Sequence, residues 1–315
     1  MNLENITASH KDPGRSTVGC TAFSAAICRA FASKSRRPLV YDPVACALFD
    51  FRTRPKEVPI VFCIMYIMWI VLPLRWVLLL IGNLLGRDIQ AATDMLGTRS
   101  KFIDDHIIEG IQEGGINQIV IFGSGLDARA ARMPLLHTTT AVRVYEVDFP
   151  NMLHAKQRLF AEIGFSGCYE ATDDKHGRAV FVGTDLSEPS KRWQSDLSDA
   201  GFDAGVPTIW VLEGLTGYLN ESELGVLFKA VSSMSCKGSL VVATWNGASG
   251  ETSKTPWRQS IHCSYVDDPE MFLPGSIWKK KKHIGIGAAT RAYGLSSSGI
   301  NATDKSYWLS LHSKL

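Results

Sequence analysis

Short apolar runs alternate with helix-length segments from about residue 99 onward, and this alternation limits the chain to a few folds. The runs are rich in β-branched and aromatic residues and cover residues 118–122, 142–147, 179–183, 208–212 and 239–244. Helix-length segments such as 149–163 and 221–235 lie between them. Strands and helices in alternation predict a parallel sheet, and apolar strands without polar alternation predict burial on both faces. The sequence therefore predicts an α/β protein with a Rossmann-like, doubly wound and mostly parallel sheet.

The first 98 residues have a different character and predict an N-terminal helical cap. Residues 20–33 have helical spacing, and residues 58–85 are the most hydrophobic segment of the chain. The uncharged run from Val58 to Leu74 is at the lower length limit for a membrane span, and its prolines shorten any helix. We expect residues 58–85 to form a lid or pocket wall, with membrane-surface docking as the alternative. The predicted division is a cap and lid over residues 1–98 and a Rossmann-like domain over residues 99–315.

Composition argues against several classes of function. The net charge of +2 gives no general attraction to nucleic acid or to anionic membranes. The seven cysteines are scattered without a C-x-x-C pair, which argues against a disulfide framework or a zinc site and favours a reducing compartment. The eight histidines show no metal-ligand spacing. We therefore expect no metal and no nucleic-acid partner.

The stretch FGSGLDARAARM begins at the end of the first predicted strand and contains a glycine-rich turn. Gly123 and Gly125 permit a tight turn and a close approach of backbone to a ligand. With Ala128 in the third small position, the spacing also fits the dinucleotide fingerprint. Asp127 disfavours a pyrophosphate, which binds helix starts because they are electropositive. S-adenosylmethionine carries a sulfonium and an ammonium and no phosphate, so charge favours this methyl donor over NAD.

Three further carboxylates follow predicted strands, where a doubly wound sheet binds its ligands. Asp148 ends the second strand, and a carboxylate there can accept hydrogen bonds from ribose hydroxyls. Asp185, followed by Leu186, comes after the third strand and can accept from an adenine amino group, although T-D-L also suits a helix N-cap. Glu213 follows the fourth strand directly, which indicates a site, with a helix-start carboxylate as the alternative.

These blocks resemble the leucine carboxyl methyltransferase family, which includes protein phosphatase and polyketide carboxyl methyltransferases. The resemblance covers about residues 21–293 and rests on TAFSAAICRAFAS, RSKFIDD, FGSGLDARAARM, YEVDFP, TDL, LEGLTGYL and PEMFLPGSIW. It implies the fold of a class I methyltransferase, S-adenosyl-L-methionine as cofactor and a lid of N-terminal helices. It also implies the residues that contact the donor, namely Gly123, Gly125, Asp148, Asp185, Leu186 and Glu213. Arg29 and Arg99 match the residues that hold the donor's carboxylate.

The chemistry of the acceptor follows from the groups available to move a proton. A carboxylate is already ionised at pH 7, whereas a phenol or alcohol acceptor needs a general base. The segment from Glu213 to Tyr218 contains no histidine, which favours a carboxylate acceptor; Glu213 and Tyr218 are the catalytic candidates, with Tyr218 a possible orienting hydroxyl. His106 and His154 are alternative bases, although both suit ordinary helical positions. The apolar segment 62–80 predicts a hydrophobic small-molecule acceptor such as a polyketide or lipid-like acid.

Two features near the C-terminus predict properties other than catalysis. The lysines at 279–282 lie beside a predicted strand and indicate a solvated edge that blocks aggregation. Ser313-Lys314-Leu315 matches a peroxisomal targeting signal, so we expect a cytoplasmic or peroxisomal location, with an import receptor as partner in the second case.

The sequence as a whole predicts an S-adenosylmethionine-dependent O-methyltransferase that acts on a carboxyl group. Two alternatives stay open. An NAD(P)-dependent oxidoreductase is indicated by the G-x-G-x-x-A spacing and Asp148. A non-catalytic, methyltransferase-like protein docked to a membrane is indicated by residues 58–85.

Overall fold

A computed structural model describes most of the 315-residue chain. The described residues are 13–35, 38–50, 75–138, 142–167, 169, 179–187, 192–248, 264–295, 300–301, 303–304 and 306–315, with the backbone alone at 13–20, 75–89 and 137–138. Most of the predicted lid, including Met65 and Trp69, lies outside the described residues, as does the side chain of Trp76.

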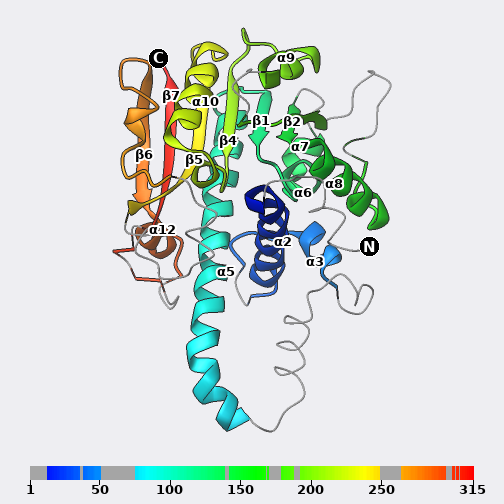
Figure 1. Ribbon diagram of the computed structural model, residues 1–315, viewed down its shortest axis with the longest axis vertical. Helices are drawn as coiled ribbons and strands as arrows, with labels where there is room; N and C mark the ends of the chain where they lie inside the picture. Colours follow the sequence, from blue (N-terminus) through cyan, green and yellow to red (C-terminus); the bar gives the residue numbers. More distant parts are fainter. Residues whose placement is uncertain are drawn as a thin grey trace.

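In the part of the chain that the structure describes, seven strands form one mixed, mostly parallel sheet in the order β3-β2-β1-β4-β5-β7-β6 (Figure 1). The parallel strands are β1 (Gln118–Phe122), β2 (Arg143–Asp148), β3 (Ala179–Gly183), β4 (Thr208–Leu212) and β5 (Leu240–Asn246). The antiparallel strands are β7 (Tyr307–Lys314) and β6 (Trp278–Gly285). This sheet confirms the predicted α/β, doubly wound architecture, and the five predicted runs correspond to β1 to β5 with small shifts at β2 and β5.

Helices cover both faces of the sheet. They are α2 (Pro13–Ser33), α3 (Pro43–Leu48), α5 (Arg75–Gln112), α6 (Arg129–Arg132), α7 (Pro134–Thr138), α8 (Pro150–Glu162), α9 (Arg192–Asp199), α10 (Glu221–Ser233) and α12 (Ile286–Ala292), with the 3₁₀ helices η1 (Thr216–Tyr218) and η3 (Pro269–Met271). The predicted segments 149–163 and 221–235 correspond to α8 and α10. Asn220 starts α10 with a capping box, in which its side chain accepts from the Glu223 amide and the Glu223 carboxylate accepts from the Asn220 amide.

Strand β1 shows why the sheet needs helices on both sides. Its residues are all buried, but alternate ones belong to different cores. Val120 and Phe122 pack in a core with side chains of α9 and α10, whereas Ile119 and Ile121 pack with those of α5 and α12. Successive side chains of a strand point to opposite faces, so an entirely apolar strand is stable only between two helical layers.

Helix α5 joins the N-terminal region to the sheet. It is continuous from Arg75 to Gln112, so the division predicted between residues 98 and 99 falls inside one helix. Its C-terminal half packs on the sheet through Phe102, Ile103 and Ile107, and α2 packs beside it (Figure 1). Within the described part of the chain, no helix is both long and apolar enough to cross a membrane.

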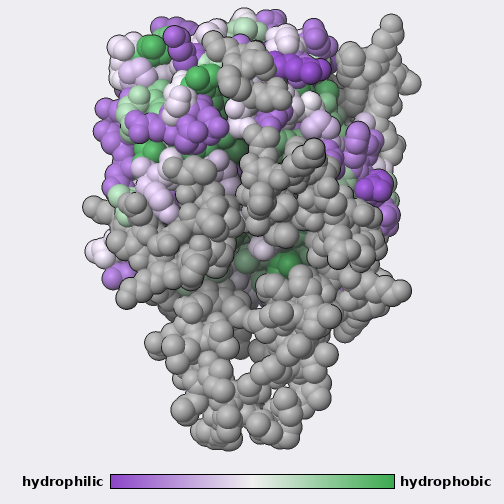
Figure 2. Space-filling view, viewed as in Figure 1, coloured by the Kyte–Doolittle hydropathy of each residue, from purple (hydrophilic) through white to green (hydrophobic). Residues whose placement is uncertain are grey.

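Strand β6 forms one edge of the sheet and carries the lysines at 279–282. All four are exposed, as predicted for a solvated edge, and hydrophilic side chains gather on the side of the molecule where β6 lies (Figure 2). A register shift between Lys280 and Lys282 interrupts the ladder with β7. Charged side chains and a bulge both discourage the addition of another strand at a free edge.

The first two residues of the C-terminal tripeptide end strand β7, and Leu315 follows it. Ser313 pairs with β5 and β6, and the Lys314 ammonium donates to the Ser232 carbonyl at 3.0 Å. The Leu315 amide donates to the Ile277 carbonyl at 3.1 Å. A receptor that reads a C-terminal tripeptide would have to release these contacts first.

Candidate active site

A cavity of about 550 Å³ opens at the carboxyl ends of the parallel strands. Its walls come from the glycine turn after β1, the ends of β2, β3 and β4, and the helices α2 and α5 that cover them. The strand order reverses between β1 and β4, and ligands of open α/β sheets bind at such a switch point. The volume is in the range of small-molecule sites. All nine predicted site residues line this cavity: Arg29, Arg99, Gly123, Gly125, Asp148, Asp185, Leu186, Glu213 and Tyr218.

The glycine turn brings backbone close to its neighbours and to the cavity. Gly123 and Gly125 have φ angles of 61° and 44°, which favour glycine. A Cβ on Gly125 would lie 3.0 Å from the Ala22 Cβ of α2, and one on Gly123 would lie 3.1 Å from Leu215. Gly125 is therefore required by the packing of α2, and Gly123 by the packing of Leu215, as well as by the turn itself.

Asp148 closes the turn from the end of β2. Its Oδ2 accepts from the Gly125 amide at 2.6 Å and its Oδ1 accepts from the Phe149 amide at 2.7 Å. Burial raises the pKa of Asp148, and the two amide hydrogen bonds partly offset this effect. A carboxylate oxygen accepts more than one hydrogen bond, so Asp148 holds the turn and still presents acceptor capacity to the cavity.

Asp185, after β3, and Tyr218, in η1, both line the cavity. The Asp185 carboxylate accepts from the Ser187 amide at 2.9 Å and from the Ser187 hydroxyl at 2.7 Å, so it stabilises the turn after β3. Tyr218 is partly buried, and its backbone amide donates to the Leu215 carbonyl. The alternative bases lie elsewhere: His106 contacts Glu109 on α5, His154 is exposed on α8, and neither lines the cavity.

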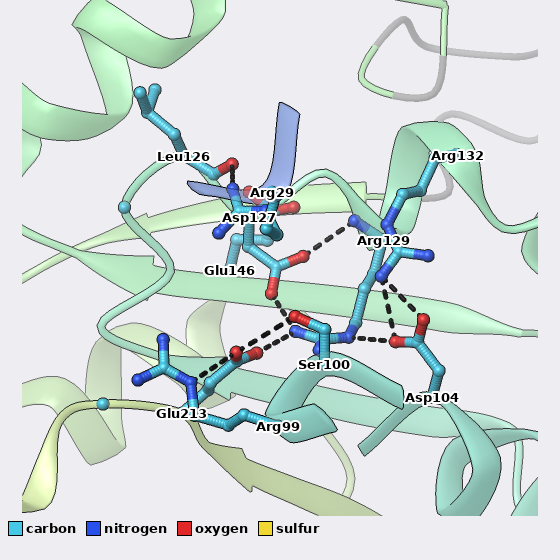
Figure 3. Close-up of polar contacts among 12 residues, drawn as sticks. Arg29, Arg99, Ser100, Asp104, Leu126, Asp127, Arg129, Arg132, Glu146 and Glu213 are labelled. Atoms are coloured by element: carbon cyan, nitrogen blue, oxygen red, sulfur yellow. Dashed lines mark hydrogen bonds and ion pairs between the residues drawn. The ribbon is translucent and has the colours of Figure 1, made fainter. Parts of the chain in front are cut away.

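Glu213 is held by two arginines (Figure 3). Its Oε1 accepts from Arg99 Nε at 2.9 Å, and its Oε2 lies 2.6 Å from Arg129 Nη1. Burial alone would raise the pKa of Glu213, but Arg129 and Arg99 reverse this and hold it well below its usual range. Glu213 is therefore a fixed negative charge and a poor proton acceptor.

Asp127 has a different role from the one predicted. Its carboxylate forms an ion pair with Arg129 Nη1 and accepts from the Arg129 amide at 2.7 Å (Figure 3). Arg129 lowers the pKa of Asp127 against the opposing effect of burial. Because its charge is matched inside the protein, Asp127 does not act as a free acid toward the ligand.

Arg29 approaches the cavity from α2. Its Nε donates to Asp42 Oδ2 at 3.0 Å, and its Nη2 donates to the Leu126 carbonyl of the glycine turn at 2.7 Å. Asp42 also caps α3 by accepting from the Ala45 amide at 2.9 Å. Arg29 thus connects helix α2 to the glycine turn that α2 covers.

Several residues that build the site were not predicted from the sequence. Arg129 and Asp104 form its buried ionic centre, with Nε of Arg129 donating to Asp104 at 2.7 Å. Ser124 lies inside the glycine turn, 4% exposed, and its hydroxyl has no hydrogen-bond partner among the described residues. The signal available for Arg129 was its place two residues after Asp127 in the turn motif. Asp104, in RSKFIDD, carried no signal that it would meet Arg129.

The model of the leucine carboxyl methyltransferase family matches residues 22–232 of the chain. A protein of Mycobacterium sp. strain JLS, described as a "Putative S-adenosyl-L-methionine-dependent methyltransferase", is 31% identical over 82% of this chain and 78% of its own. A protein of Mycobacterium avium strain 104 with the same description is 32% identical over 75% of this chain and 70% of its own. These relatives favour S-adenosylmethionine over a nicotinamide dinucleotide as the cofactor.

Solved structures show the same fold at low sequence identity. A DUF574 family protein of Streptomyces avermitilis has a TM-score of 0.54 at 14% identity, covering 74% of this chain and 89% of its own. A protein of Thermobifida fusca described as a "putative methyltransferase" has a TM-score of 0.51 at 16% identity, covering 70% of this chain and 82% of its own. The sheet is therefore of the type found in class I methyltransferases.

Proposed function

Because this chain belongs to the leucine carboxyl methyltransferase family, we propose that it transfers the methyl group of S-adenosylmethionine to the carboxylate of a hydrophobic small molecule. Dependence on S-adenosylmethionine is the property shared with its relatives. What we propose beyond this concerns the acceptor: the methyl group goes to an oxygen atom, this oxygen belongs to a carboxylate, and the acceptor molecule is apolar.

The residues around the cavity fit the methyl donor. The glycine turn offers close backbone approach. The Ser124 hydroxyl, which has no partner among the described residues, is a buried group that a polar ligand would satisfy. Asp148 and Asp185 present acceptor oxygens from the ends of β2 and β3, where we place the ribose and the adenine. Arg29 and Arg99 supply positive charge for the donor's carboxylate.

The proposal of a carboxylate acceptor rests on one observation: the described residues that line the cavity include no available base. No histidine is among the described residues that line the cavity. Each lining carboxylate already has partners in the protein, as described above for Asp127, Asp148, Asp185, Glu213 and Glu223. An acceptor that is already ionised at pH 7 needs none of them to remove a proton.

Apolar side chains make up much of the remaining wall. They come from α5, from α8 and from the segments after β3 and β4, and are Met95, Leu96, Met152, Leu186, Leu215 and Leu219. Such a wall excludes water and suits the apolar body of an acid such as a polyketide or a fatty acid. We propose that residues 1–98 act as cap and lid, with residues 58–85 enclosing the acceptor.

Catalysis in this site depends on alignment more than on proton transfer. When bound, S-adenosylmethionine supplies the methyl group and becomes the neutral thioether S-adenosylhomocysteine as the acceptor oxygen takes the methyl. The chain's part is to orient both partners in line and to exclude water. We propose that the ion-paired carboxylate of Glu213 helps to fix the donor end of this line, with the Tyr218 hydroxyl orienting the acceptor.

The first test is thermal unfolding with S-adenosylhomocysteine, S-adenosylmethionine and NAD in parallel. A ligand at about 100 times its Kd stabilises by about 2.7 kcal/mol, so we expect a Tm increase of a few degrees with the first two and none with NAD. The acceptor is then sought with radiolabelled donor and paired substrates, each hydrophobic acid beside its alcohol. We expect label only in the acids, as methyl esters that mild alkali cleaves. Alkali-stable label in the alcohols would reject the carboxylate acceptor.

A further inference from the structure

Arg129 connects three acidic residues that come from separate parts of the chain. Its side chain is 2% exposed. Its Nε donates to Asp104 of α5, and its Nη1 lies between Asp127 of the glycine turn and Glu213 after β4 (Figure 3). Contacts from three directions fix the plane of this guanidinium, which in turn fixes the position of Oε2 of Glu213.

The other oxygen of Glu213 holds Arg99 at Nε, at 2.9 Å. The two terminal nitrogens of Arg99 make no hydrogen bond to the described residues, and Arg99 lines the cavity. Gly214 makes room for them, because a Cβ at this position would lie 3.3 Å from Arg99 Nη1. A guanidinium held at Nε presents its terminal nitrogens as a fork, and a fork of this kind matches the two oxygens of a carboxylate.

We propose that Arg129 is a positioning residue for the methyl donor. It holds the Glu213 carboxylate, Glu213 orients Arg99, and Arg99 receives the α-carboxylate of S-adenosylmethionine. Arg129 is not among the residues that line the cavity, so it acts through Glu213 and Arg99. The proposal rests on the placement of the donor given under the proposed function.

The test compares two ligands that differ in the amino-acid part. S-adenosylhomocysteine has the α-carboxylate, whereas 5′-methylthioadenosine keeps the nucleoside and the thioether without it. In Arg129→Lys we expect the affinity for S-adenosylhomocysteine to fall about tenfold or more, since a charge-assisted contact is lost. The affinity for methylthioadenosine stays unchanged. Equal losses for both ligands would show a merely structural role and overturn the proposal.

Arg132→Lys is the matched control, because Arg132 contacts Asp104 in the same cluster and not Glu213. We expect it to leave both affinities unchanged. Adding Arg129→Lys to Arg99→Met should cause no further loss of S-adenosylhomocysteine affinity, whereas additive losses would overturn the proposal. If Arg129→Lys does not fold, Glu213→Gln provides the same comparison of ligands.

These measurements distinguish a failure of this proposal from a failure of the proposed function. If Arg99→Met weakens both ligands equally, the placement of the donor carboxylate is wrong, and the role of Arg129 is rejected with it. If S-adenosylhomocysteine does not bind the unaltered protein at all, the cofactor assignment itself fails.

Discussion

Glu146 lies on β2 and Glu213 directly follows β4, the two strands that flank β1, yet the surroundings of these two largely buried carboxylates give them opposite properties. Glu146 on β2 is 0% exposed and contacts one cation, Lys156 of α8, and the Tyr169 hydroxyl at 3.0 Å. Burial outweighs these contacts and raises the pKa of Glu146. Glu213 contacts two guanidiniums, and its pKa is lowered despite burial. The number of cations, and not burial alone, decides whether the pKa of such a carboxylate is raised or lowered, and the carboxylate with the lowered pKa lines the cavity.

Removing the charge of Lys156 should produce the largest change in the free energy of unfolding. Lys156→Met leaves Glu146 buried without a cation, and we expect a loss of about 3–5 kcal/mol of unfolding free energy at pH 7. Urea denaturation measures it. Donor affinity should stay unchanged in the folded protein, because neither residue lines the cavity.

The double variant Lys156→Met/Glu146→Gln is the control for this change. It removes both charges, so we expect most of the lost stability to return. If the double variant were as unstable as Lys156→Met, the Lys156 side chain would stabilise the fold by packing and not by its charge. The comparison of the two glutamates would then fail.

The pH dependence of stability should separate the two glutamates next. The folded pKa of Glu213 is lowered, so its stabilising effect is present above the ordinary glutamate pKa and is lost as pH falls. We expect Glu213→Gln to cost about 1.5–3 kcal/mol at pH 7 and progressively less toward pH 3.

The stabilising contribution of Glu146 should change with pH in the opposite direction. Its folded pKa is raised, so the protonated form stabilises the fold at low pH and this contribution is lost as pH rises through the folded pKa. Glu146→Gln should therefore gain stability relative to the unaltered protein as pH rises. Denaturation curves from pH 3 to pH 8 test both variants, and slopes of the same sign would contradict the assigned environments.

Removing the Tyr169 hydroxyl should produce the smallest change in the free energy of unfolding. Tyr169→Phe removes one hydrogen bond to Glu146, and we expect a loss of about 1 kcal/mol with no change in donor affinity. A shift in donor affinity would show that the Glu146 cluster is coupled to the cavity, which the geometry does not predict.

The sheet could be predicted from sequence because its determinants are local. Strands such as β1 and β4 are continuous apolar runs bounded by turn residues, and their bounds are as predicted. The acids after β2, β3 and β4 were predicted to meet because parallel strands bring their carboxyl ends to one edge. Helix α5 could be predicted less well from the sequence, since its pattern before residue 99 suggested a separate hydrophobic segment.

The ionic centre could not be predicted, because its members are far apart in sequence. Asp104 and Arg129 are brought together by the packing of α5 against the sheet, and a charge pattern along the chain does not show such a pairing. The role expected for Asp127 was wrong for the same reason, since the effect of its charge depends on the arginine that the fold places beside it.

The sequence by itself determined the order of strands and helices, the glycine turn and the set of polar residues at the carboxyl edge, because periodicity and turn chemistry are properties of neighbouring residues. Only the tertiary structure decided which charges cancel and which remain directed at the cavity. Electrostatic energy depends on distance and burial in space, and both are fixed when α2 and α5 close over the ends of the strands.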